Sequence, residues 1–265
     1  MNSEKAYNGL SFDELKEFLE EKYLKFNTLS FIDADPISIP HRFSSRADRE
    51  IAGFLAATIA WGRRDLILKS SNRLMGLLQN APHDFIINAD DDDIEQLTGF
   101  VYRTFNGHDC MVFIHGLRHI FTHYTSVEDV IVEGMKAANG SLISGLSHLR
   151  NVFFSVNHTR RSEKHFANVA AGSAGKRLFM YLRWMARKDT KGVDFGIWNR
   201  INPSELFIPL DLHSGNTARK TGLLARKQND FKAVAELTAE LRKFDPYDPV
   251  KYDFALFGLG VNEKF

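Results

Sequence analysis

Helical periodicity is the feature of this sequence that most restricts the fold. Residues 45–62, SRADREIAGFLAATIAWG, place Ile51, Phe54, Leu55 and Ile59 on one face of a helix. Similar patterns recur along the chain, whereas the alternation that a half-buried strand requires is scarce. We therefore predict an all-α fold.

Helix boundaries are indicated by capping signals. Ser11 is followed three residues later by Glu14, which matches a capping box, and the aspartates of residues 90–93 suit the positive end of a helix dipole. Residues 27–45 and 158–165 are expected to be loops. Further helices are predicted over residues 13–26, 64–80, 109–124, 127–138, 142–156, 176–188 and 230–244.

The length of 265 residues suits one globular unit built from two helical lobes. We expect the first lobe over residues 45–150 and the second over residues 151–265, with the N-terminal residues packing on the second. The chain has 34 basic and 33 acidic residues, a balance that neither requires nor excludes nucleic acid as a partner.

Cys110 is the single cysteine, so an intramolecular disulfide and a four-cysteine zinc or iron–sulfur site are excluded. The polar N-terminal segment lacks the apolar region of a signal peptide, and no apolar run reaches membrane-spanning length. A cytoplasmic protein without a membrane partner is the expectation.

A turn of small residues precedes a basic helix start in AAGSAGKRLFMYLRWM, residues 170–185. Gly172 and Gly175 permit a tight turn, and Lys176 opens the next helix, an arrangement that can bind phosphate. A nucleotide-binding P-loop is disfavoured, because Ala170 stands where a glycine is required and Arg177 where Ser or Thr is required. A helix-hairpin-helix turn and an ordinary helix corner both remain open.

A second segment, FIPLDLHSGNTARKTGLL at residues 207–224, places Asp211 thirty-five positions after Lys176. The pair of elements, GSAGK and IPLDLHSGNTARKTGLL, resembles the helix-hairpin-helix DNA glycosylase superfamily, and its spacing is most similar to the archaeal 8-oxoguanine glycosylase branch. Most of the chain also resembles a bacterial family of unknown function, up to DPYDPVKYDFALFGLG at residues 245–260.

The resemblance to DNA glycosylases implies two helical lobes with a cleft between them, and a damaged base, expected to be an oxidised purine, flipped out of DNA. Lys176 would attack the sugar and form a Schiff base, and Asp211 would stabilise the developing positive charge. No cofactor or metal is implied. The implied DNA contacts are Gly172, Ser173, Gly175, Arg177, His213, Arg219 and Lys220. The implied base pocket contains Trp61, Arg63, Arg64 and Trp184.

The sequence departs from the superfamily at two places. The usual hairpin, Leu-Pro-Gly-Val-Gly-x-Lys, has a proline that this turn lacks, and its glycines are spaced differently. The segment around Trp61 lacks the glutamine that relatives often carry. Lys176 as a phosphate contact, Asp211 as a plain N-cap and Trp61 as a core residue therefore remain alternatives.

Two other function classes remain open. One is a nucleic-acid binder without catalysis, to which the basic residues 158–164 would contribute contacts. The other is an all-α metal-dependent phosphohydrolase, which uses His-Asp pairs together with further histidines. The residues considered for that metal site are His83, Asp84, His108, Asp109, His41, His115 and His119.

Overall fold

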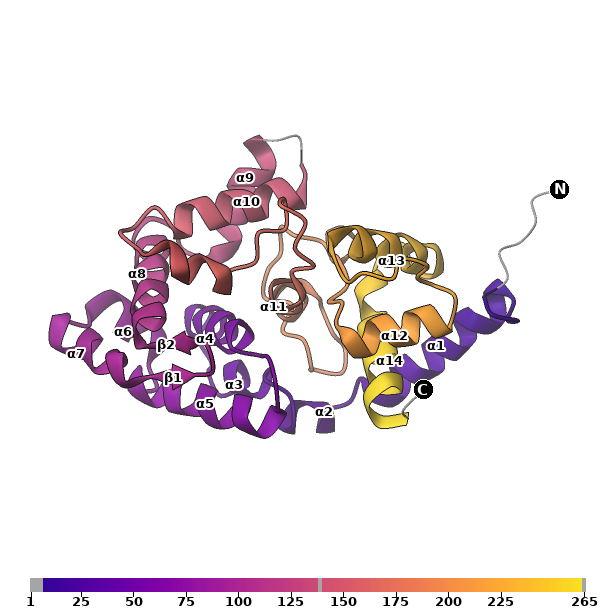
Figure 1. The fold of residues 1–265 in the computed structure, drawn as a ribbon, viewed down its shortest axis with the longest axis horizontal. Coiled ribbons are helices and arrows are strands. Elements are labelled where there is room, and N and C mark those ends of the chain that lie inside the picture. Colours follow the sequence, from indigo (N-terminus) through magenta and orange to yellow (C-terminus); the bar gives the residue numbers. More distant parts are fainter. Residues whose placement is uncertain (1–6, 138–139, 264–265) are drawn as a thin grey trace. The chain divides into compact units, whose positions relative to one another are not determined.

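The computed structural model describes residues 7–137 and 140–263 (Figure 1). Within these ranges the chain is mostly helical, with one two-stranded hairpin, so the all-α prediction is confirmed. The chain divides into two compact units. We call Ile32–Ala170 the central unit, and the residues through Phe31 together with those from Ala171 onward the terminal unit.

The central unit extends beyond the lobe expected over residues 45–150. At its C-terminal side, Arg161 and Ser162 donate to the carboxylate of Asp109, and the Phe166 ring packs against Phe153. These contacts hold residues 160–166 against α8 (Gly107–His123) and α10 (Leu142–Phe153), which explains why the boundary lies at Ala171.

The helices of the central unit surround a core rich in phenylalanine. The Phe54 ring of α4 lies 5.5 Å from Phe153 and 5.4 Å from Phe166. The elements are α3 (Ser38–His41), α4 (Arg46–Thr58), α5 (Arg64–Leu77), α6 (Pro82–Asn88), α7 (Asp91–Glu95), η1 (Gln96–Gly99), β1 (Val101–Tyr102), β2 (Phe105–Asn106), α8 (Gly107–His123), α9 (Val127–Ala137), α10 (Leu142–Phe153) and η2 (Arg160–His165).

The segment 27–45, expected to be a loop, contains two single-turn helices, α2 (Ser30–Asp33) and α3. The side chain of Asp35 accepts from the backbone N–H of Ile37, which helps to start the second of them. Farther along, α9 and α10 pack closely because Gly145 has no side chain. A Cβ there would lie only 2.6 Å from the backbone oxygen of Ile131.

The terminal unit is built around α11, of which only the first two residues are not buried. Its first helix has the expected capping box, because the Ser11 hydroxyl accepts from the Glu14 N–H and the Glu14 carboxylate accepts from the Ser11 N–H. The elements are α1 (Phe12–Phe26), α11 (Lys176–Ala186), η3 (Pro203–Glu205), α12 (Leu212–Lys220), α13 (Phe231–Phe244), η4 (Pro249–Lys251), α14 (Tyr252–Gly258) and η5 (Leu259–Glu263).

Two findings concern the whole described chain. No helix in residues 7–137 or 140–263 is both long and apolar enough to cross a membrane. The thiol of Cys110 on α8 is buried, and burial raises its pKa to about 12.

Candidate functional site

The turn before α11 has the conformation that its glycines allow. Gly172 and Gly175 both have positive φ, at 95° and 58°, and Gly175 is the N-cap of α11 in the left-handed region. Residues 166–171 before the turn contain no helix and consist of a bend, irregular backbone and a turn. The first helix of the expected helix-hairpin-helix is therefore not present immediately before the turn. The Gly172 carbonyl instead accepts from the backbone N–H of Phe231, which ties the turn to the start of α13.

The segment before Asp211 is extended and is held by two contacts with α13. The backbone N–H of Ile208 donates to the Thr238 hydroxyl of α13, and the Arg242 guanidinium donates to the carbonyl of Leu206. Arg242 also lies over the ring of Phe207. Because α13 holds this segment, the position of Asp211 at its end is well defined.

Asp211 is the N-cap of α12, and its two carboxylate oxygens have different surroundings. Oδ1 accepts from the backbone N–H of Ser214 at 2.9 Å, while the Ser214 hydroxyl accepts from the Asp211 N–H at 3.0 Å. Oδ2 lies 3.8 Å from Nζ of Lys176. The plain capping role and the pairing with Lys176 therefore occur together.

The Lys176–Asp211 pair is accessible. The side chains are 29% and 22% exposed, so a ligand can reach both charged groups without unfolding of the unit. The two residues lie at the starts of α11 and α12, where the helix dipoles are positive. The positive end of a helix favours a carboxylate at the position that Asp211 occupies.

A basic hollow of about 300 Å³ lies on α12, the helix that Asp211 caps. His213, Arg219 and Lys220, which the sequence predicted as DNA contacts, line it together with Asn216 and Gly260. The Arg219 guanidinium is held in place, because Nε donates to the carbonyl of Arg226 and Nη2 donates to the side chain of Asn229. The hollow presents fixed donors that suit an anionic group such as phosphate.

The remaining predicted DNA contacts lie at the turn. Gly172 and Ser173 are exposed, whereas Gly175 is buried and its N–H donates to the Ser173 hydroxyl at 3.3 Å. Arg177 is half-buried, and burial lowers its pKa to about 10. It remains a cation at neutral pH.

Three residues of the predicted base pocket belong to the central unit. The Trp61 ring is stacked on His165 with 6.0 Å between ring centroids and meets the edge of Tyr102. Trp61 is partly exposed, so it is not a fully buried core residue. Arg63 is exposed and pairs with Asp65, and Arg64 is half-buried at the start of α5.

Trp184, the fourth predicted pocket residue, is in the wrong environment for that role. It has 0% exposure in the core of the terminal unit, so no face of its ring is open to a base. Most of the α11 surface is buried, and a sequence pattern of mixed basic and aromatic residues does not reveal that. The structure therefore removes Trp184 from the candidate site.

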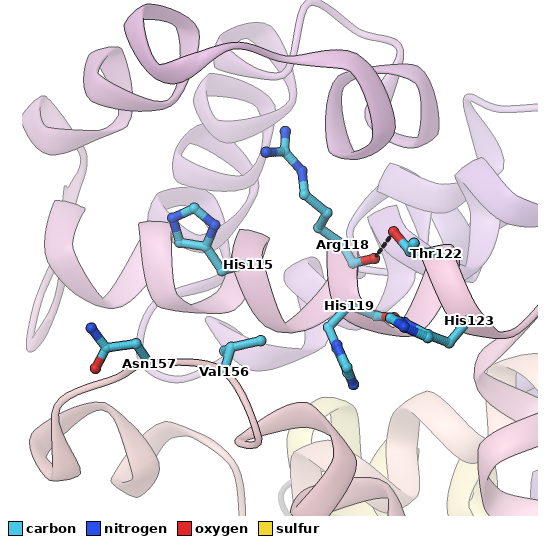
Figure 2. Close-up of a pocket in the computed structure, with 7 residues that line it drawn as sticks. All are labelled: His115, Arg118, His119, Thr122, His123, Val156 and Asn157. Atoms are coloured by element: carbon cyan, nitrogen blue, oxygen red, sulfur yellow. Dashed lines mark hydrogen bonds between the residues drawn. The ribbon is translucent and has the colours of Figure 1, made fainter.

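Two of the histidines considered for a metal site, His115 and His119, lie on α8 and line an open pocket of about 480 Å³. Figure 2 shows His115 and His119 on this helix, with Val156 and Asn157 on the segment that follows α10. The Arg118 side chain extends to the side of the helix opposite His119. Burial first, and then the charge of Arg118, lowers the pKa of His115. Among the described residues, no group of three or more His, Cys, Asp or Glu side chains is placed to hold a metal ion.

The other members of the metal hypothesis are dispersed. Asp109 is buried in a cluster with Arg161, Ser162 and His165, and its carboxylate accepts from both the guanidinium and the hydroxyl. The His108 ring contacts the Thr159 hydroxyl, so the side chains of His108 and Asp109 have different partners. The Asp84 carboxylate accepts from the side chain of Asn88, and the His83 ring packs on Phe121.

Sequence reasoning did not find a buried acidic residue of the terminal unit, Asp253. Asp253, in the first turn of α14, is buried and accepts from the Arg183 guanidinium of α11. The charges of Lys176 and Asp211 both act on it. The sequence did contain a signal, because an aspartate stands inside the apolar run YDFALFGL at residues 252–259. An unpaired buried carboxylate is costly, so an aspartate in such a run predicts a buried polar or cationic partner.

Comparison with known proteins identifies a family for this chain. Neither the curated proteins nor the solved structures contain a match to this chain. Residues 35–262, which include the Lys176–Asp211 pair and most of both units, match a family described as "Protein of unknown function (DUF2400)". Because the match covers most of its length, the chain belongs to the DUF2400 family.

Proposed function

We propose that this protein removes a damaged base from DNA, with Lys176 as the nucleophile and Asp211 as its electrostatic partner. The observation that carries the proposal is the 3.8 Å approach of Lys176 Nζ to Asp211 Oδ2, made by two side chains that both remain partly exposed. An oxidised purine is the substrate class that the resemblance to helix-hairpin-helix glycosylases favours.

The chemistry assigns one role to each group. The neutral amine of Lys176 forms a bond to the anomeric carbon of the sugar, the N-glycosidic bond breaks, and the base leaves with the bonding electrons and takes up a proton. Loss of the protons on Nζ and opening of the sugar ring then give a Schiff base. Asp211 stabilises the positive charge that develops on the sugar, because Oδ2 is the oxygen that is not committed to the helix cap.

DNA binding is supported by cations on α11 and α12, the two helices that begin at the pair. Arg219 and Lys220 line the hollow on α12 with His213, and Arg177 follows Lys176 at the start of α11. Guanidinium and ammonium groups of this kind contact phosphates and position the nucleic acid. Gly172 and Ser173, both exposed at the turn, would allow the backbone of a strand to approach closely.

Borohydride trapping tests the catalytic proposal directly. Wild-type protein is incubated with duplexes that carry 8-oxoguanine or other lesions, borohydride reduces any Schiff base, and mass spectrometry locates the adduct. We expect the adduct on Lys176, its loss in Lys176→Ala, and a decrease of about 100-fold or more in Asp211→Asn.

The control for this experiment is Lys227→Ala, which removes an exposed lysine of the same unit and should leave the adduct unchanged. If no duplex gives an adduct, and Lys176→Ala processes DNA as wild type does, then Lys176 has no role in catalysis.

A second candidate is a nucleic-acid binder without base excision. It is favoured by the hollow on α12, whose basic residues lie apart from the Lys176 amine and could bind phosphate alone. In that case affinity for DNA should fall steeply with salt, and Lys176→Ala should weaken binding without changing any product.

A further inference from the structure

The C-terminal end of α8 carries two histidines whose rings are close to each other. His119 and His123 are four residues apart, a spacing that places both side chains on one face of a helix. The centres of their rings are separated by 4.4 Å, and Figure 2 shows the two side chains next to each other on α8. His119 is half-buried and His123 is exposed, so a small ligand can reach both rings from solvent.

The hydrogen bond of His123 determines which of its ring nitrogens is available. Nδ1 lies 2.8 Å from the backbone carbonyl oxygen of His119. A carbonyl oxygen only accepts, so in the neutral ring Nδ1 carries the proton and Nε2 keeps its lone pair. Histidines that bind a metal ion commonly donate their second nitrogen to a backbone carbonyl in this way, which fixes the orientation of the ring.

His119 can supply the second nitrogen. Its ring makes no hydrogen bond with the part of the chain that the structure describes. A metal ion lies about 2.0–2.1 Å from an imidazole nitrogen, so two rings that bind it at about 90–110° have centres roughly 4.5–5 Å apart. The observed separation of 4.4 Å is close to this range, and small rotations of the two side chains would complete the geometry.

The surroundings of the pair favour a cation. His123 is the last residue of α8, and the C-terminal end of a helix carries a partial negative charge. The Arg118 guanidinium donates to the backbone carbonyls of Ile86 and Ala89. Figure 2 shows this side chain on the side of α8 opposite His119, so its positive charge is held away from the two rings.

The pair lines the pocket of about 480 Å³ described above, which lies within the central unit. No three His, Cys, Asp or Glu side chains of residues 7–137 and 140–263 are placed to hold a metal ion together, so the protein would supply two ligands. The pocket has room for water or a small anion at the other coordination positions. The side chain of Asn157, which also lines the pocket, can hydrogen-bond to such a ligand.

We propose that His119 and His123 bind a divalent transition-metal ion of the Ni²⁺, Cu²⁺ or Zn²⁺ class, each through one ring nitrogen. Imidazole ligands suit ions of this class, whereas Mg²⁺ and Ca²⁺ prefer oxygen ligands. The ion lies at the negative end of α8, and its open coordination positions face the pocket. This metal site belongs to the central unit and is independent of the function proposed for Lys176 and Asp211.

Calorimetric titration of the untagged protein with Ni²⁺ at pH 7.5 tests the site. We expect the affinity to fall about tenfold or more in His119→Gln and in His123→Gln, because each variant removes one of two ligands. His115→Gln is the matched control, because His115 lines the same pocket but lies outside the pair. Its affinity for Ni²⁺ should equal that of wild type.

Histidine modification locates the ion in the wild-type protein, so it does not depend on the folding of any variant. The protein is treated with diethyl pyrocarbonate with and without Ni²⁺, and mass spectrometry follows the modification of each histidine. We expect Ni²⁺ to slow the modification of His119 and His123. His108, which is exposed at the start of the same helix, should react equally fast in both samples.

Three results would overturn the metal site. They are a wild-type protein that binds no Ni²⁺, a His123→Gln variant that binds it as wild type does, and a His115→Gln variant that loses as much affinity as His119→Gln. Equal modification of His119 and His123 with and without saturating Ni²⁺ would also contradict the proposed ligands. None of these measurements involves DNA, so they leave the borohydride test of Lys176 unaffected.

Discussion

Each unit places an aspartate in the capping box of a helix, and the two aspartates have opposite surroundings. Asp109 of the central unit has 0% exposure and accepts from Ser162 and Arg161 and from the backbone N–H of Asn106. Asp211 of the terminal unit is partly exposed, and one of its oxygens has only a long approach to Lys176. A carboxylate whose oxygens all accept hydrogen bonds from the protein stabilises the fold, whereas a carboxylate with an oxygen that can still accept is able to bind a ligand.

The largest effect that this comparison predicts is the loss of folding stability in Asp109→Ala. Its removal takes a fully buried carboxylate away from the buried Ser162 hydroxyl and His165 ring and from the partly exposed Arg161 guanidinium. We expect the free energy of unfolding to fall by about 3–5 kcal/mol, measured by urea denaturation. A loss below about 1 kcal/mol would mean that the cluster is not the structural element we describe.

Acid should remove part of the same stabilisation. Burial alone would raise the pKa of Asp109, but the hydrogen bonds from Asn106, Arg161 and Ser162 hold it below its usual range. The contribution of the carboxylate is therefore complete above about pH 4, the pKa of an unfolded aspartate, and is lost as the pH falls through the lower folded value.

The difference in unfolding free energy between wild type and Asp109→Asn should accordingly shrink below about pH 4. A difference that stays constant from pH 6 to pH 3 would contradict the lowered pKa of Asp109.

The smallest stability effect is expected at Asp211. Asp211→Ala removes the cap of α12 and should lower the free energy of unfolding by about 0.5–2 kcal/mol, whereas Asp211→Ser keeps a capping oxygen and should cost less. Both variants should lose the covalent adduct on Lys176. Retention of the adduct in Asp211→Ser would show that capping alone is the role of Asp211.

The sequence was informative where a local pattern decides the structure. The capping box at Ser11, the turn at Gly172 and Gly175 and the late helix that ends before Asp245 are all present. These features depend on residues within a few positions of one another. The approach of Lys176 to Asp211 was also predicted, although from a family resemblance and not from periodicity.

The remaining features depend on contacts between distant residues. Arg183 meets Asp253 seventy positions later, and Arg161 meets Asp109 fifty-two positions earlier. No local pattern encodes these pairs. The burial of Trp184 was missed for a similar reason, since it depends on the segments that pack around α11 and not on α11 itself.

The sulfur of Cys110 gives the central unit an internal reporter. Because the thiol is fully enclosed and its pKa is raised to about 12, a thiol-specific dye reacts with it only when that part of the chain opens. With one cysteine in the sequence, the dye signal has a single origin. The rate of dye labelling would report how often the central unit opens, and opening of the terminal unit, which carries Lys176, would not contribute to it.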